Sequence, residues 1–441
     1  MLIVLSMFGC GDKSTDTSIH TDTAETTSVV ENDDTQYVFL NQDGESSVSY
    51  TGQTYRNLLI HDLTHYIEAL DERMLTDIVT SGQVETDLLF YLESIKDLDG
   101  AFPHGYVVEG ETLLQTEYAD VSTGKNLLEK LAGNDSVTDH QDWSTAFYGW
   151  GEADVSSPES LVRLWISQLD AQAADWSNVA SQTPNVYTSR DGVDYKQMLH
   201  TFLLCGVAYS QGTDDYLDND VADKGLLASH VPTEGSTYSA LEHAWDEGFG
   251  YFGAAQDVIL WTDSEIASPS ALDRNGDGQI DLKSEVNWNF SRLAAQKDLD
   301  GLGTDFTADA WKAFWAGRDL LNRTVGAELS DTDMAQLVEL RNQAVTAWEK
   351  VLVATIVDAL NNTVQHIDTS APLEELAHDW STMKGLSLGL QFNPHTSLST
   401  EQFMQIQDLI GQFPKTNGQY IDDLLSVRQV LVDVYDVNEG H

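Results

Sequence analysis

Residues Tyr238–Glu285 read YSALEHAWDEGFGYFGAAQDVILWTDSEIASPSALDRNGDGQIDLKSE, and our interpretation of the chain starts from them. The first part, Tyr238–Trp261, is predicted to form a helix that carries a histidine among acidic residues. The last part, Asp273–Glu285, has the residue order of a calcium-binding loop. Both parts carry side chains that bind cations, so we expect the rest of the chain to be a scaffold that holds them.

The segments on both sides of this stretch repeat apolar residues at the spacing of amphipathic helices. In the clearest case, Ser330 is positioned to cap a helix whose apolar stripe runs from Leu337 to Leu360. Ser399 and Gln402 have the spacing of a capping box at the start of another helix. Helices are predicted at 53–70, 83–98, 157–169, 194–209, 238–261, 285–297, 306–321, 330–360, 373–388, 399–410 and 420–435.

Strands are almost absent from the prediction. Only 37–50 is rich enough in Val, Tyr and Phe to form a short extended piece. No other segment alternates apolar and polar residues with a period of two. We therefore predict a mainly α fold over residues 37–441, made of antiparallel helices in one large or two packed bundles with long loops.

The calcium-like loop is the most complete local motif. Its first nine positions provide oxygen ligands at every second residue, which are Asp273, Asn275, Asp277, Gln279 and Asp281. Gly278 stands where the backbone turns sharply, and Ile280 occupies the apolar position of such loops. The motif departs from a full EF-hand at its end, because Ser284 stands at position twelve and Glu285 follows one residue late. We predict a Ca²⁺ site over 273–285 that recruits Glu285; the alternative is a polar turn without an ion.

The predicted helix before this loop carries a second candidate site. His243, Asp246 and Glu247 lie three or four residues apart, so we expect them to project from one helical face. A histidine nitrogen with one or two carboxylates suits a transition metal such as iron or zinc. The segment is not HExxH, so it lacks the general base and second histidine of a zinc protease. The alternative is a core histidine that is hydrogen-bonded to a carboxylate.

Other histidines extend these possibilities. His378 precedes Asp379 and Trp380 on an apolar helix, and it could share a metal with His243 if the two helices face each other. His61 and His65 lie four residues apart on one predicted helix, which also allows a shared metal. Without a third ligand in that motif, surface histidines are the simpler interpretation.

The N-terminus has the pattern of a bacterial lipoprotein. Residues 1–9 read MLIVLSMFG, an apolar run that ends in a small residue before Cys10. We predict that 1–9 is a signal peptide, that Cys10 carries a lipid, and that 10–36 is a disordered acidic tether rich in Thr and Ser. The other cysteine, Cys205, lies in an apolar helix and is predicted to be buried. These features predict a protein of the cell envelope, on the outer membrane.

The charge balance limits the partners. The chain has 72 acidic and 22 basic residues, a formal net charge of −50. Nucleic acid and anionic membrane surfaces would repel such a surface, so the predicted membrane contact is through the lipid anchor alone. The same charge concentrates cations around the protein. No protein partner can be named from the sequence.

Three segments together resemble a known bacterial family. YSALEHAWDEGFGYFG, WEKVLVATIVDALN and AHDWSTMKGLSLGLQFNP are similar to domain of unknown function 4856, which is distantly similar to imelysin. The resemblance covers about Ser47–Tyr435. It implies helical bundles, a lipid anchor at the cell envelope and a metal role linked to iron uptake. His243 and Asp246 match the imelysin motif GxHxxE in part, with Leu241 in place of its Gly and Asp in place of its Glu.

These observations lead to three functional hypotheses. The one we favour is a non-catalytic envelope lipoprotein that binds metal ions for capture or uptake. The second is an imelysin-type metallopeptidase, which would gather His243, His378 and a carboxylate around one open metal position. The third is a structural or adhesive surface protein in which Ca²⁺ stiffens a loop.

Overall fold

The computed structural model describes residues 32–76, 79–98, 100–134, 143–151, 155–268 and 271–441. The predicted signal peptide, Cys10 and most of the tether lie outside these residues. From Asp33 onward the chain forms one compact unit. Among the described residues, no helix combines the length and the apolar character needed to cross a bilayer.

The described part of the chain is mainly α-helical, as predicted, and has isolated β-bridges in place of strands. One bridge joins Leu40 to Ser46 within the predicted extended piece. The α-helices are α1 (Thr51–Glu68), α2 (Leu70–Thr76), α3 (Gln83–Leu92), α4 (Tyr118–Val121), α5 (Trp143–Ala146), α6 (Pro158–Ala174), α7 (Trp176–Val179), α8 (Tyr195–Leu203), α9 (Ala240–Phe252), α10 (Asp263–Ala267), α11 (Asn289–Asp298), α12 (Phe306–Thr324), α13 (Asp331–Thr369), α14 (Leu373–Gly389), α15 (Thr400–Ile410) and α16 (Gly418–Tyr435). Short 3₁₀ turns lie at Ser94–Asp97, Leu128–Lys130, Gly225–Leu227, Val258–Leu260 and Leu390–Phe392.

Several predicted helices have different limits in the structure; for example, the helix predicted at 83–98 ends at Leu92 and the one predicted at 330–360 runs to Thr369. The helix predicted at 238–261 ends at Phe252, because Gly253 takes the left-handed conformation (φ 86°) that terminates helices. The helix predicted at 285–297 begins only at Asn289, because Trp288 N–H first donates to Gly253 O and holds the chain there. The helix predicted at 194–209 is α-helical only to Leu203. It continues as two π-helical segments, Leu204–Tyr209 and Gln211–Tyr216.

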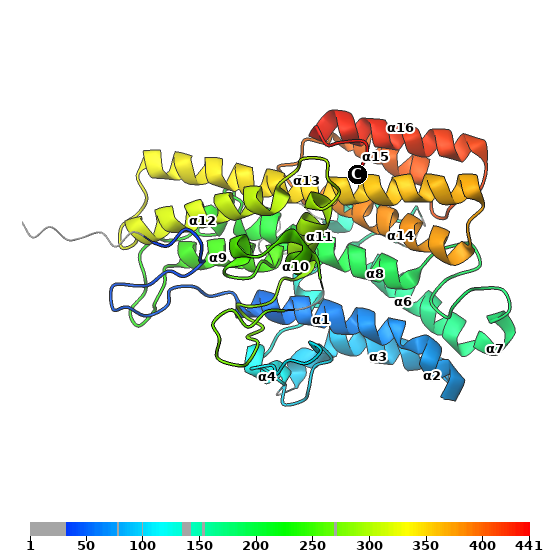
Figure 1. The fold of residues 1–441 in the computed structure, drawn as a ribbon, viewed down its shortest axis with the longest axis horizontal. Coiled ribbons are helices and arrows are strands. Elements are labelled where there is room, and N and C mark those ends of the chain that lie inside the picture. Colours follow the sequence, from blue (N-terminus) through cyan, green and yellow to red (C-terminus); the bar gives the residue numbers. More distant parts are fainter. Residues whose placement is uncertain (1–31, 77–78, 99, 135–142, 152–154, 269–270) are drawn as a thin grey trace, which may run out of the picture. The chain divides into compact units, whose positions relative to one another are not determined.

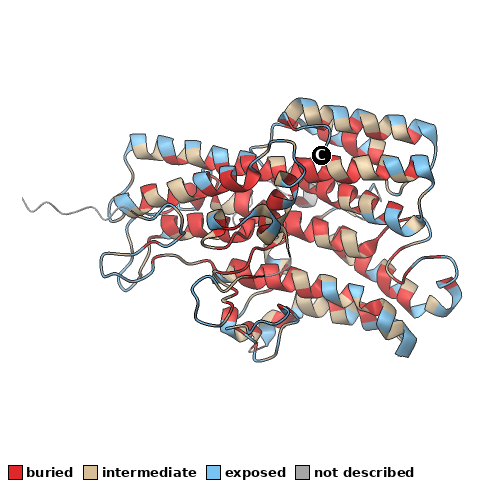
Figure 2. Cartoon of the chain, viewed as in Figure 1, coloured by how far each residue is buried: buried red, intermediate tan, exposed pale blue. Residues whose placement is uncertain are grey.

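The core is organised around α13. This helix has 39 residues and therefore a length of roughly 59 Å. It packs against α11, α12, α14 and α16 (Figure 1). Buried residues are concentrated in the middle of the bundle, where α8, α9 and α13 run (Figure 2).

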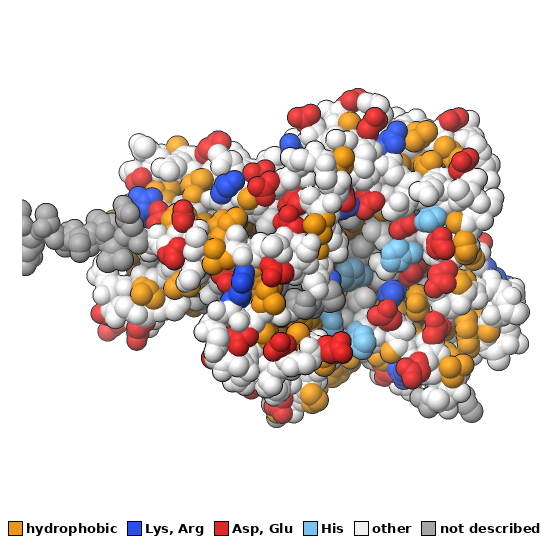
Figure 3. Space-filling model, viewed as in Figure 1, with side chains coloured by type: hydrophobic (Ala, Val, Ile, Leu, Met, Phe, Trp, Pro, Cys, Tyr) orange, Lys and Arg blue, Asp and Glu red, His pale blue; other side chains and the backbone are white. Residues whose placement is uncertain are grey.

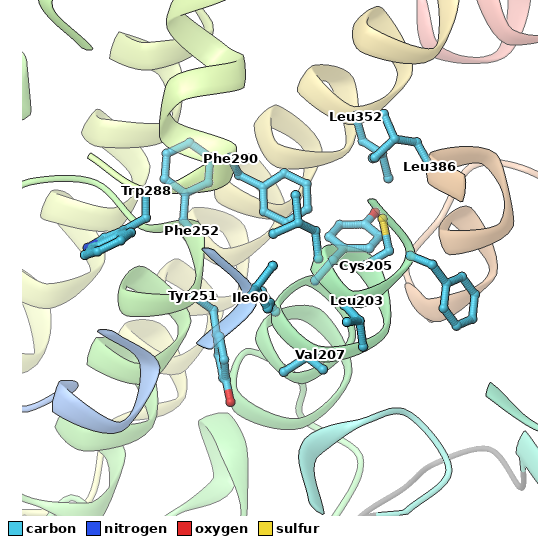
Figure 4. Packing of buried hydrophobic residues seen from close by; sticks show 14 of the residues in the cluster. Ile60, Leu203, Cys205, Val207, Tyr251, Phe252, Trp288, Phe290, Leu352 and Leu386 are labelled. Carbon is cyan, nitrogen blue, oxygen red and sulfur yellow. The ribbon is translucent and has the colours of Figure 1, made fainter. Parts of the chain in front are cut away.

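Aromatic rings fill the centre of this core. Trp348 on α13 is fully buried, and its ring packs on aromatic rings from α9, α11 and α12, which are Phe252, Phe290 and Phe314. Cys205 is buried close to the same centre, as predicted (Figure 4). The close packing depends on small residues: a Cβ at Gly317 of α12 would lie 1.9 Å from the Trp245 ring on α9. Only glycine at 317 therefore allows α9 and α12 to approach this closely.

Arg318 joins α12 to α9 and to the N-terminal segment. Its guanidinium is fully buried and pairs with Glu242 and Asp246 of α9, each at 2.8 Å. It also donates to the backbone and side-chain oxygens of Ser47. Buried charges are stable only when they are paired and hydrogen-bonded, and here all three are.

Arg318→Ala should lower the free energy of unfolding by about 3–5 kcal/mol, because it leaves two buried carboxylates without their cation. Arg323→Ala is the matched control on the same helix. Its side chain is 49 % exposed and pairs with Asp319 at the surface, so its loss should cost below about 1 kcal/mol. Urea unfolding of both variants measures the difference. Equal losses would contradict the role we assign to Arg318.

Candidate ion-binding sites

The loop 273–285 curls around the side chain of Asp273. Asp273 Oδ1 accepts hydrogen bonds from Gly276 N (2.7 Å) and Asp277 N (3.2 Å), and its Oδ2 accepts one from Gly278 N (2.8 Å). The two glycines have φ angles of 76° and 88°, which residues with a Cβ rarely adopt. The glycines therefore permit the tight turn, and the Asp273 carboxylate holds its amides together.

Glu285 closes the loop from the other side. It is buried, and its Oε1 accepts hydrogen bonds from Arg274 N and Asn275 N, each at 3.0 Å. Its Oε2 accepts one from Asp281 N at 2.9 Å. Glu285, which follows position twelve of the motif by one residue, therefore still belongs to the loop. It binds backbone amides near the start and near the end of the loop.

The loop is attached to the segment before α4. Ile280 pairs with Leu113 in a parallel bridge, and its N–H and C=O both bond to that segment's backbone at 2.8 Å. Gln115 adds two side-chain bonds, donating to Asp281 Oδ1 and accepting from Leu282 N, each at 2.8 Å. Position eight of the motif therefore has the anchoring role that the sequence predicts.

The loop forms a tight turn, but the structure does not arrange its side chains as a set of metal ligands. Among the described residues, no three His, Cys, Asp or Glu side chains are grouped so that they could hold a metal ion. Asn275 and Asp277 are exposed, and their side-chain oxygens accept from the amides of Asp277 and Gln279. Calcium binding by this loop stays a prediction.

The structure separates the members of the α9 motif. Asp246 is fully buried and accepts hydrogen bonds from Tyr37 Oη, Ser49 N and Arg318 Nε. His243 lies nearer the surface, with its Nδ1 2.9 Å from Ser49 O and its Nε2 3.7 Å from Glu247 Oε1. Because a carbonyl can only accept, Nδ1 carries a proton, so in the neutral imidazole the lone pair is on Nε2. His243 and Glu247 form a pair, while Asp246 belongs to the core.

His378 lies away from this pair. It is exposed on α14, and its Nδ1 is 3.1 Å from Gln197 Nε2 on α8. The residues that contact His243 come from α9, from Tyr238 just before it and from the segment before α1. Helices α9 and α14 are drawn apart in Figure 1. The structure therefore does not bring the two histidines together.

A cavity of about 290 Å³ lies between α1, α8 and α11. We call it the α1–α8–α11 cavity; its wall is formed by His61, Thr64, His65, Glu68, Tyr106, His200, Leu204, Asn287, Trp288, Asn289, Arg292, Leu293 and Gln296. In Figure 3 histidine side chains gather on one face over the region of α1, α8 and α14. The rings of His61 and His65 stack with their centres 6.1 Å apart, as their four-residue spacing permits.

Of the residues in this cavity wall, sequence reasoning singled out only His61 and His65 and missed the others, including His200, Asn287 and Arg292. His200 and Arg292 belong to no motif, and they come together only through the packing of α8 and α11 around α1. The sequence gives no distinctive local signal for either residue, because a histidine or an arginine on a predicted helix is too common to identify a site.

Comparison with known proteins gives a single match. Residues 155–269 match the family described as "Domain of unknown function (DUF4856)". The matched part includes α6, α8 and α9, with the segment YSALEHAWDEGFGYFG, and it ends before the loop 273–285. No curated protein and no solved structure matches the chain.

Stability should depend on His200 between about pH 4 and 6.5. Burial lowers the pKa of His200 to about 4, and nearby His61 and Arg292 act in the same direction. The unfolded chain then binds a proton that the folded chain lacks, so the free energy of unfolding should rise as pH increases through this range. His200→Gln should flatten this rise in urea-unfolding experiments, whereas the exposed His65→Gln should preserve it. An identical pH profile for His200→Gln and the wild type would refute this prediction.

Proposed function

We propose that this protein is a non-catalytic, ion-binding protein of the bacterial cell envelope. Its residues 155–269 match a domain of unknown function. The observation that carries this proposal is the turn of 273–285 around Asp273, with both glycines in the left-handed region. The lipid anchor at Cys10 is part of the proposal and rests on the sequence alone.

Electrostatics support Ca²⁺ as the ion. Asp273, Asp277, Asp281 and Glu285 crowd four carboxylates into one loop, and the two basic residues among them are Arg274 and Lys283. Each carboxylate has about four lone-pair positions, and the amide bonds of the loop use only some of them. Ca²⁺ takes six to eight oxygen ligands from carboxylates, carbonyls and water, so it can use the remaining positions and relieve the repulsion.

A peptidase of the imelysin type receives less support. That activity would need His243 and His378 around one metal, but His378 is exposed on α14 and bonds to Gln197. The relation to imelysin itself rests on the three sequence segments. We therefore put the binding function forward.

Ca²⁺ should raise the melting temperature of the wild-type protein by roughly 3–5 °C at a hundredfold excess over its Kd. Asp277→Ala should remove most of this shift, because it deletes one ligand. It should hardly change the melting temperature in EDTA, since the exposed Asp277 side chain accepts a single hydrogen bond in the described structure, from Gln279 N. Asp43→Ala removes one negative charge from another loop and is the matched control. Equal melting temperatures of the wild type in EDTA and in Ca²⁺ would exclude the proposal.

The His243–Glu247 pair is the second ion site that we propose, for a transition metal. The bond to Ser49 O orients the imidazole and leaves Nε2 facing Glu247, and a backbone bond of this kind is how metal-binding histidines are usually held. His243→Ala should abolish the calorimetric binding of Zn²⁺, and Glu247→Gln should weaken it about tenfold or more. His378→Ala should bind Zn²⁺ like the wild type. Loss of binding in His378→Ala with retention in His243→Ala would reject this pair.

A further inference from the structure

We infer that the α1–α8–α11 cavity binds a small organic monocarboxylate, whose carboxylate is held by Arg292 and Asn287. The inference is independent of the proposed ion sites. It rests on unsatisfied donors in the cavity wall, on the charge of the cavity, and on its size and aromatic lining.

Arg292 is a cation without a counter-ion. Among the described residues, no carboxylate lies within ion-pair distance of its guanidinium; Nη2 donates to Ala267 O at 3.2 Å. Its Nε is buried and has no hydrogen-bond partner. Burial lowers the pKa of Arg292, although nearby Tyr106 opposes the effect. In a chain of net charge −50, a part-buried arginine without an acidic partner is destabilising, and an anionic ligand would compensate its charge.

Asn287 lines the same cavity and carries a second unsatisfied donor. Its side chain is 5 % exposed, and its Oδ1 accepts from Ala255 N (2.9 Å) and Ser291 Oγ (2.9 Å). The bond from a backbone N–H fixes the orientation of the amide, because only the oxygen can accept it. The Nδ2 group is therefore a true donor, and it has no partner in the described structure. A carboxylate provides two acceptor oxygens, which suits an amide N–H beside a guanidinium.

The charge of the cavity favours one negative charge on the ligand. His200 adds no positive charge near pH 7, because its pKa is lowered to about 4. Thr64 Oγ1 donates to Ile60 O, so His200 Nδ1 is the donor in its 3.0 Å bond to Thr64. The carboxylate of Glu68 lies 3.5 Å from Lys196 Nζ. Arg292 is then the main uncompensated charge of the cavity, and the acidic surface of the protein disfavours dianions such as phosphate.

The volume and the lining of the cavity favour an organic ligand. A cavity of about 290 Å³ is at the lower end of the range for small-molecule sites. The rings of Tyr106 and Trp288 line it with their centres 4.9 Å apart. Leu204, the first residue of the π-helical segment after α8, also lines it. Aromatic and aliphatic walls with a few convergent donors are typical of sites for small organic acids.

The test is ligand-observed NMR on the full chain with benzoate and acetate as probes and benzyl alcohol as the uncharged match for benzoate. The wild type should bind benzoate saturably and should not bind benzyl alcohol. Arg292→Gln should weaken benzoate binding about tenfold or more, since it removes the charged donor. Gln296→Glu, at an exposed position of the cavity wall, should weaken it by adding a negative charge without disturbing the core.

Two controls match these variants in chemistry. Arg190→Gln and Gln405→Glu make the same changes at exposed positions outside the cavity, and both should bind benzoate like the wild type.

Arg292→Met should keep or raise the melting temperature of the ligand-free protein, because it removes an uncompensated charge. A lower melting temperature for Arg292→Met would show a structural arginine and would overturn the inference.

The remaining outcomes also decide the question. No saturable binding of either carboxylate by the wild type overturns the inference. Displacement of benzoate by inorganic phosphate or chloride at equal concentration overturns the assignment to carboxylates. The titrations are made both in Ca²⁺ and in EDTA, so that a failure of the proposed calcium function can be told apart from a failure here.

Discussion

The buried guanidinium of Arg318 fixes the relation between three parts of the fold. It pairs with Glu242 and Asp246 on α9 and donates to Ser47 in the segment before α1. Asp246 in turn accepts from Ser49 N, two residues further along that segment. Ser49 O is then in position to orient His243. The surface histidine of α9 is thus held, through a chain of hydrogen bonds, by a charge in the core.

Two arginines of this protein show opposite solutions to the burial of charge. Arg318 has two carboxylates and two serine oxygens around it, so each of its buried groups is satisfied by the protein. Arg292 has a backbone carbonyl and a buried Nε without a partner. A satisfied arginine contributes to the unique arrangement of the helices. An arginine with unpaired donors lowers the stability of the ligand-free protein, and a bound ligand can pair with those donors.

Local features were predictable from the sequence, and contacts between distant segments were not. Ser330 and Ser399 begin their helices as predicted, because a cap needs only the next three residues. The glycine turns of 273–285 were predictable for the same reason. Asp246 was expected beside His243, yet it faces Arg318, which lies 72 residues away in the sequence. Arg292 carried no local signal, because its lack of an acidic partner depends on which side chains the fold places around it.

The loop 273–285 and the α1–α8–α11 cavity share a continuous piece of backbone. Glu285 closes the loop, Asn287 lines the cavity two residues later, and Trp288 is held to Gly253 O. A ligand that orders one end of this short connection reduces the entropy that a ligand at the other end must still remove. Any coupling between the two positions is necessarily reciprocal: a cation that tightens the retention of the acid is itself retained more tightly by the acid's presence. Occupancy of the loop and occupancy of the cavity can be linked in this way without movement of the helices.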